Sequence, residues 1–140
     1  MPPQFLFDLS SIDLTKVAYG PDEIRKVNPH RGDMEMLNGI IWVDTDAGCI
    51  LGYKDIRADE FWVSGHIPGR PIFPGVLMIE TAAQLASFYT KKFIQWPGFI
   101  GFGAANECRF RGQVLPGQRM LFLAKKIWDQ IGRASCRERV

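Results

Sequence analysis

The chain has 140 residues, enough for one domain with a buried core. Hydrophobic residues make up 46% and charged residues 23%, which excludes a disordered or collagen-like chain. No apolar run approaches the roughly 20 residues of a membrane helix. The opening residues, MPPQFLFDLSSID, lack the basic start and apolar core of a signal peptide. We therefore expect a cytoplasmic protein that does not bind membranes.

The cysteines and histidines are too few and too scattered for a metal site. Cys49, Cys108 and Cys136 are not at metal-ligand spacing, and the chain has only two histidines. An odd cysteine count in a chain without a secretion signal favours free thiols. We expect no structural zinc and no disulfide.

The last ten residues, IGRASCRERV from Ile131 to Val140, differ in character from the rest. They hold three arginines and one glutamate, which account for the whole net charge of +2 and leave 14 basic and 14 acidic side chains elsewhere. The peptide resembles the translation of a common short-read sequencing adapter, although a natural basic tail is the alternative. We expect a domain at residues 1–130 that is truncated after Gln130, followed by a non-native tail at 131–140. The pI of 8.5 is then no argument for nucleic-acid binding.

The first half of the chain predicts a short helix and a hairpin. Residues 1–20 hold strand-like apolar pieces, and PDEIRKV at Pro21–Val27 has the early proline, first acids and last bases of a helix. Two apolar, branched segments at Gly39–Val43 and Cys49–Ile56 flank an Asp/Gly turn, which favours two strands.

The second half predicts one long helix between irregular and extended segments. The stretch FWVSGHIPGRPIFPG is too rich in glycine and proline for a regular element. From Val76 to about Ile94 apolar residues cover nearly every side of a helix, which is typical of a buried one. Two strands, FIGFGAANECRFRGQV and GQRMLFLAKKIW, should follow, joined at 115–117. This order predicts an α+β fold in which an antiparallel sheet wraps around one central helix.

Three residues stand out as candidates for chemistry. His66 lies in the rigid Gly/Pro loop, and an imidazole can act as a base at neutral pH. Glu80 is the one charged side chain between Arg70 and Lys91, and a dry site would favour the protonated carboxyl that a general acid needs. Gly75 opens the helix, where free N–H groups can polarise a carbonyl. The alternatives are a structural histidine, a carboxylate bonded to backbone and a plain Pro-Gly turn.

The run GHIPGRPIFPGVLMIETAAQ, Gly65 to Gln84, resembles the signature of the FabZ-type (3R)-hydroxyacyl-[acyl-carrier-protein] dehydratases of fatty acid biosynthesis. NPHRGDM at Asn28–Met34 and ECRFRGQVLPGQRM at Glu107–Met120 extend the resemblance, which covers roughly residues 24–128. The related FabA-type isomerising enzymes have an aspartate at the acid position, so Glu80 favours the FabZ type.

The resemblance implies a hot-dog fold, with His66 as catalytic base, Glu80 as catalytic acid and the Gly75 amide as the group that binds the substrate carbonyl. It implies a homodimer, possibly assembled further as a trimer of dimers, in which each site takes its histidine from one subunit and its acid from the other. The substrate would be carried on the 4′-phosphopantetheine arm of acyl carrier protein, with the acyl chain in an apolar tunnel. No metal or organic cofactor is implied.

Some residues depart from the family pattern or have a second interpretation. GDMEM at 32–36 replaces an aromatic and aliphatic run after Pro-His-Arg, which leaves the acyl chain length and pathway open. His30 is interpreted as a structural hydrogen-bonder. Five basic side chains could attract acidic carrier protein or form a solvated face: Arg70, Lys91, Lys92, Arg109 and Arg111. Four aromatic side chains could line the tunnel or belong to the core: Phe61, Trp62, Phe99 and Phe102.

Two other functions remain open on the sequence. One is a hot-dog acyl-thioesterase, in which a helix carboxylate directs water at the thioester, although this leaves the Gly-His-x-Pro-Gly loop without a purpose. The other is a non-catalytic acyl-binding subunit, which would have no need to keep both His66 and Glu80.

Overall fold

The computed structural model describes residues 5–130 and 133–139, with side chains described from 5 to 127. The elements in order are α1 (Pro21–Val27), the 3-10 turn η1 (Gly32–Met34), β1 (Gly39–Asp44), β2 (Cys49–Asp55), α2 (Gly75–Tyr89), the π-helical turn η2 (Thr90–Ile94), β3 (Arg119–Gln130) and β4 (Arg133–Arg139). The predicted α+β architecture is confirmed.

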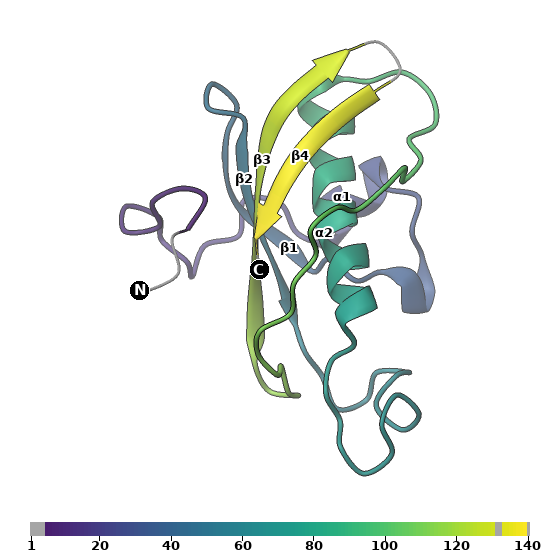
Figure 1. The fold of residues 1–140 in the computed structure, drawn as a ribbon. Coiled ribbons are helices and arrows are strands. Elements are labelled where there is room, and N and C mark those ends of the chain that lie inside the picture. Colours follow the sequence, from purple (N-terminus) through teal and green to yellow (C-terminus); the bar gives the residue numbers. More distant parts are fainter. Residues whose placement is uncertain (1–4, 131–132, 140) are drawn as a thin grey trace.

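The sheet is antiparallel, in the order β1-β2-β3-β4, and α2 lies against one of its sides (Figure 1). Asp44 begins the turn between β1 and β2 by accepting hydrogen bonds from the Asp46 and Ala47 amides, and Gly48 completes it at a φ of 71°. The predicted hairpin is therefore confirmed.

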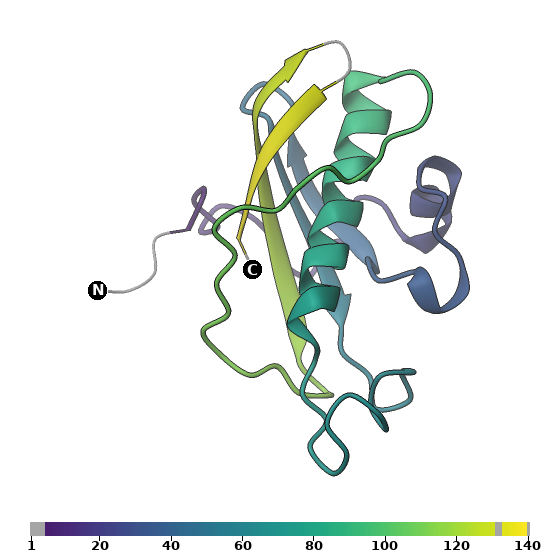
Figure 2. The ribbon, with the colours of Figure 1, turned by 45° about the vertical axis from the view of Figure 1, so that its right-hand side comes forward.

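Both sides of the sheet are covered, which explains why β2 is buried along nearly its whole length. The larger core lies between the sheet and α2 and includes Ile40, Phe88 and Phe122. A smaller cluster on the other side joins Ile41, Leu51, Tyr53 and Leu123 to apolar side chains of residues 6–12. The N-terminal segment, predicted to contain strand-like pieces, instead forms turns that cover the outer side of the sheet (Figures 1 and 2).

Helix α2 and η2 together occupy Gly75–Ile94, close to the predicted span. Gln95, at a φ of 58°, ends the helical run. The prediction that this helix is buried on all sides is only partly right in a single chain. Val76 is 72% exposed, and Ile79, Ala83 and Ala86 are only half-buried.

Of the two strands predicted after the helix, the second is found as β3, whereas the first is wrong. Residues 99–114 were predicted to form a strand but are irregular, and they run alongside α2 rather than within the sheet (Figure 2). A strand needs a neighbour for its backbone hydrogen bonds, and no described strand lies beside this segment. Conversely, β4 forms in the tail, where no pattern predicted a strand. Backbone pairing along the open edge of β3 does not depend on an apolar repeat.

Candidate active site

The loop at residues 61–74 holds His66 in a defined orientation. The His66 amide donates to the Trp62 carbonyl at 2.9 Å, and the ring Nδ1 lies 2.9 Å from the Ile72 carbonyl oxygen. A carbonyl can only accept, so Nδ1 donates to it, and in the neutral imidazole Nε2 keeps its lone pair. The Phe73 amide donates to the Val114 carbonyl at 2.8 Å and ties the end of this loop to the segment after residue 98. His66 is thus an exposed imidazole whose free nitrogen can accept a proton.

Glu80 projects from the second turn of α2 and lies beside His30. Its Oε1 is 3.4 Å from His30 Nε2 and accepts a hydrogen bond from Gln84 Nε2 at 2.9 Å. The Glu80 side chain is 31% exposed, so the expected dry environment is absent in the single chain. Among the described residues no hydrogen bond or ion pair joins Glu80 to His66.

Gly75 is the first residue of α2, after Pro74 as N-cap. The Leu77 and Met78 amides bond back to the Pro74 carbonyl, whereas the Gly75 and Val76 amides have no acceptor among the described residues. Free amides at a helix start can bind a partly negative oxygen. A Cβ at Gly75 would lie 3.0 Å from the Phe110 ring, so a larger side chain here would collide with that ring.

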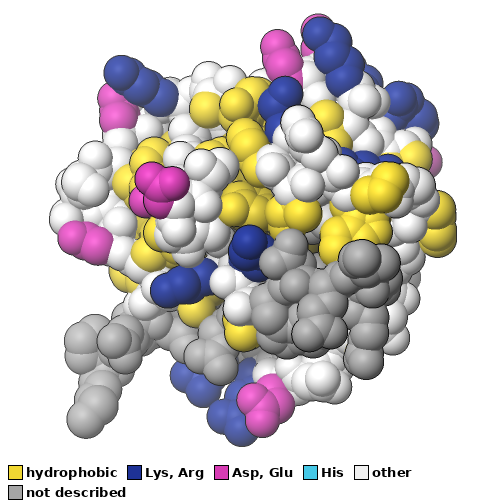
Figure 3. Space-filling model, turned by 90° about the horizontal axis from the view of Figure 1, so that it is seen from above, with side chains coloured by type: hydrophobic (Ala, Val, Ile, Leu, Met, Phe, Trp, Pro, Cys, Tyr) yellow, Lys and Arg dark blue, Asp and Glu magenta, His cyan; other side chains and the backbone are white. Residues whose placement is uncertain are grey.

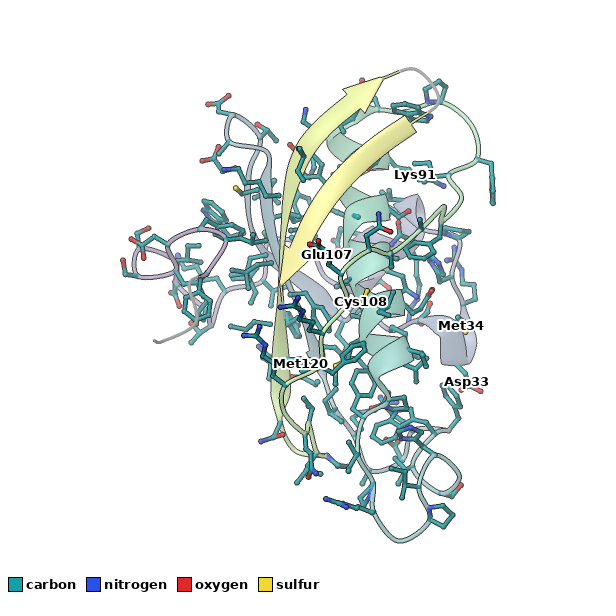
Figure 4. All side chains as sticks on the ribbon, in the orientation of Figure 1. Asp33, Met34, Lys91, Glu107, Cys108 and Met120 are labelled. Carbon is teal, nitrogen blue, oxygen red and sulfur yellow. The ribbon has the colours of Figure 1, made fainter. Side chains whose placement is uncertain are left out.

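The structure places the secondary candidates as follows. Trp62 belongs to the core, whereas Phe61, Phe99 and Phe102 are exposed, so the core interpretation is wrong for these three. Arg70, Lys92, Arg109 and Arg111 are exposed, and Lys92 also lies 5.3 Å from the centre of the Tyr19 ring. Figure 4 marks Lys91 near the end of the helix and Cys108 on the segment that passes in front of it. Cys49 and Cys108 are free thiols as expected, and Cys136 lies outside the residues with described side chains.

A pocket of about 280 Å³ lies between α1, η1 and residues 54–61. Its lining includes His30 and Gln84 but also charged side chains such as Arg25, Lys54 and Glu60. It is not the apolar tunnel that the family resemblance implies. Across residues 5–127 no group of three or more His, Cys, Asp or Glu side chains is arranged for a metal ion.

The sequence reasoning missed Gln84 and underestimated His30. Gln84 lies four residues after Glu80, a spacing that puts two side chains on the same face of a helix and could have revealed the pair. The proximity of His30 to Glu80 depends on a tertiary contact, the hydrogen bond from the Asn28 side chain to the Gln84 carbonyl at 3.0 Å. No sequence pattern indicates it.

Comparison with known proteins shows the family to which the chain belongs. The FabA-like domain family matches residues 28–135, which is most of the chain. The chain belongs to the FabZ-type 3-hydroxyacyl-[acyl-carrier-protein] dehydratase family. The FabZ dehydratase of Rhizobium etli is 40% identical over 119 residues, covering 84% of this chain and 72% of its own.

Two further FabZ relatives match to a similar extent. Those of Saccharophagus degradans and Thermotoga neapolitana are 37% and 35% identical over 114 and 112 residues, which in both cases is 79% of this chain and 78% of the relative. The matched region includes the His66 loop, the start of α2 and Glu80. The FabZ family thus accounts for the hot-dog arrangement of sheet and central helix.

Proposed function

We propose that the protein dehydrates (3R)-3-hydroxyacyl-[acyl-carrier-protein] to trans-2-enoyl-[acyl-carrier-protein] in fatty acid biosynthesis or a related lipid or polyketide route. Membership of the FabZ family supports the reaction. The observation that carries the assignment in this chain is the tautomer of His66. The Ile72 carbonyl holds the proton on Nδ1, which leaves Nε2 ready to accept one.

His66 Nε2 takes the proton from C2 of the substrate, and the electron pair moves toward the thioester carbonyl. The free amide of Gly75 stabilises the negative charge on that oxygen. The C2=C3 double bond forms as the C3–O bond breaks, and protonated Glu80 gives its proton to the departing hydroxyl, which leaves as water. The proton held by His66 returns to Glu80 through solvent, which restores both groups.

The site is completed by a second copy of the chain, so that His66 of one subunit faces Glu80 of the other. The absence of a direct His66–Glu80 contact in one chain supports this arrangement. So does the exposed apolar surface formed by α2 and the segment after it, with Val76 at 72% and Phe99 at 88% exposed. The end of the molecule seen from above, opposite the start of α2, also exposes hydrophobic side chains among basic and acidic ones (Figure 3). Further assembly as a trimer of dimers, and a cytoplasmic location, belong to the same proposal.

We also propose that residues 131–140 are a non-native extension of the domain at residues 1–130. The support is the composition of the tail and its resemblance to an adapter peptide. Sequencing the source DNA past Gln130 tests this directly. An open frame that encodes further strand-like sequence is expected, and a genomic copy of IGRASCRERV would contradict the proposal.

The activity is tested with a 3-hydroxyacyl thioester by recording enoyl product and free thiol separately. The parent should form enoyl product without thiol release, whereas an acyl-thioesterase would release thiol. His66→Ala should lower kcat by roughly 10²–10⁴-fold, the usual contribution of a positioned acid or base. Its Tm should stay close to that of the parent because the side chain is exposed. Unchanged turnover in His66→Ala would support the acyl-binding alternative instead.

A further inference from the structure

The chain between β2 and α2, residues 56–74, carries His66 and extends beyond the start of the helix (Figure 1). Between Arg57 and Ile72 only Trp62 is buried. Little apolar packing therefore holds this loop in one shape. The orientation of His66 depends instead on a few specific contacts.

One buried ammonium group contacts both ends of the loop. Lys54 belongs to β2, and its side chain is only 3% exposed. Its Nζ lies 2.7 Å from Glu60 Oε1 and 5.7 Å from the centre of the Phe73 ring. Glu60 precedes His66 in the chain and Phe73 follows it. A single side chain of the sheet thus attracts a carboxylate at one end of the loop and an aromatic ring at the other.

Hydrogen bonds connect each end of the loop to His66. At the first end, the carbonyl of Trp62, two residues after Glu60, accepts a hydrogen bond from the His66 amide at 2.9 Å. At the second end, Phe73 directly follows Ile72, whose carbonyl oxygen lies 2.9 Å from the imidazole Nδ1. The backbone of His66 is therefore held from one end of the loop and its ring from the other.

The Glu60 carboxylate has both oxygens engaged. Its Oε1 faces Lys54, and its Oε2 accepts a hydrogen bond from the Arg57 amide at 2.8 Å. A buried ion pair contributes little net stability, because the cost of removing two charges from water offsets most of their attraction. Its best-attested use is to select one arrangement of the groups around it. Here the arrangement that it can select is that of the loop.

We propose that Lys54 and Glu60 are positioning residues for the dehydration, acting through the loop that they hold and not on the substrate. The ammonium group keeps the two ends of the loop in register. This keeps the Ile72 carbonyl on Nδ1 of His66 and leaves Nε2 free as the base. The inference rests on the proposed function, because it assigns the origin of the base geometry in that reaction.

The double variant Lys54→Met/Glu60→Gln tests this by removing both charges at nearly constant volume. Once the ends of the loop can shift, the His66 ring should leave the Ile72 carbonyl and populate both neutral tautomers, whereas the parent holds the proton on Nδ1. NMR of the imidazole nitrogens at alkaline pH, where the ring is neutral, measures this. The chain has only two histidines, so the spectrum of His66→Ala identifies the signals of His66.

The same shift moves the base away from C2 of the substrate. We expect kcat of the double variant to fall about 10- to 100-fold, with KM within about 3-fold of the parent, because the base acts in the transition state. The assay is run well below the Tm of the variant, where a loss of stability alone leaves kcat unchanged. An unchanged tautomer, or a kcat loss smaller than about 5-fold, would overturn the proposal.

The matched control is Asp55→Asn/Arg119→Gln, which removes an ion pair from the next residue of β2. Arg119 donates to both oxygens of Asp55, at 2.6 and 2.9 Å, and this pair joins β2 to β3. Neither Glu60 nor Phe73 is among its described contacts. The control should keep the tautomer and the kcat of the parent. An equal loss of kcat in the control would contradict a specific role for Lys54 and Glu60.

Glu60→Gln decides the question if the double variant does not fold. One of the two donors, the Lys54 ammonium or the Arg57 amide, then faces an N–H group in place of an oxygen. The start of the loop should shift, which gives the same mixture of His66 tautomers and a kcat loss of at least about 5-fold. A parent-like tautomer or a smaller loss would again count against the proposal.

The proposed function is judged separately by the parent and by Glu80→Gln. If the parent forms no enoyl product, the function itself fails, while the tautomer of His66 still tests the ion pair because that measurement needs no substrate. If the parent is active, Glu80→Gln is inactive and Lys54→Met/Glu60→Gln behaves as the parent does, only the positioning role fails.

Discussion

At the scale of single residues, backbone carbonyl and amide groups determine how the side chains of the candidate site are protonated and oriented. The Ile72 carbonyl selects the tautomer of His66, and the amides of Met36 and Leu37 select the orientation of Gln84. A backbone amide can only donate and a backbone carbonyl can only accept. Backbone partners therefore orient a polar side chain more reliably than side-chain partners do. The chemistry of this site therefore depends on backbone groups of the loop that carries His66 and of residues 36–37.

An ion pair near the site gives a pH-dependent prediction. Arg25 Nε and Nη2 donate to the two oxygens of Glu35 at 2.6 and 2.9 Å, and this contact lowers the pKa of Glu35 below its ordinary value of 4.5. A lowered carboxyl pKa stabilises the fold above the unfolded-state pKa, and the contribution is lost as the pH falls through the folded-state pKa.

We expect Glu35→Gln to reduce the free energy of unfolding at pH 7 by about 0.5–1 kcal/mol, since Arg25 is partly exposed and solvent screens the pair. The difference from the parent should disappear at acid pH, below the folded-state pKa of Glu35. Urea denaturation at pH 7 and at acid pH measures it. A constant difference at both pH values would show that packing, rather than charge, is responsible.

At the scale of elements, α2 approaches the sheet closely because β2 has a glycine beneath it. A Cβ at Gly52 would lie 2.7 Å from Leu85 Cδ1 and 3.1 Å from the Gly39 carbonyl oxygen. The contact with backbone cannot be relieved by a change of rotamer. The distance between helix and sheet is therefore set at this position.

Gly52→Ala should destabilise the protein by about 1–3 kcal/mol, the usual cost of overpacking a core. Gly103→Ala is the matched control, since a Cβ there meets no heavy atom within 4 Å. Thermal or chemical denaturation of both variants measures the effect. Equal stability of the two would mean that α2 can move away from the sheet at little cost.

A buried ion pair joins β2 to the loop that carries His66. Lys54 Nζ lies 2.7 Å from Glu60 Oε1, with side chains only 3% and 6% exposed. Lys54→Met leaves Glu60 buried without its partner and should cost about 3–5 kcal/mol. The double variant Lys54→Met/Glu60→Gln removes both charges and should recover at least half of that loss. A double-variant cycle by urea denaturation measures the coupling, and additive losses would contradict it.

Local patterns predicted those elements whose stability comes from their own residues. The early proline and the order of charges in α1, the Asp/Gly turn between β1 and β2 and the apolar run of α2 are all visible in the sequence. Residues 99–114 have the composition of a strand but no neighbouring strand in one chain, so the strand predicted from their composition does not form. In the site, the motif identified His66 and Glu80, whereas the contacts of His30 and Gln84 required the tertiary structure.

At the scale of the whole molecule, the chain covers one side of its sheet fully but leaves apolar side chains exposed on the side of α2. The outer side of the sheet is covered by the chain's own N-terminal segment. The α2 side leaves Val76 and Phe99 in solvent and holds Glu80 apart from any base in the His66 loop. A second copy that covers this surface would bury the apolar side chains and complete the site in one step.

Subunit complementation tests this claim most directly. His66→Ala and Glu80→Gln are each inactive on their own, but a mixed dimer holds one site with both groups intact. Random exchange at equal concentrations makes half of the dimers mixed, each with one working site of two, so about a quarter of the parent activity should appear. If tagged subunits demonstrably exchange and the mixture stays inactive, His66 and Glu80 do not act across the two subunits.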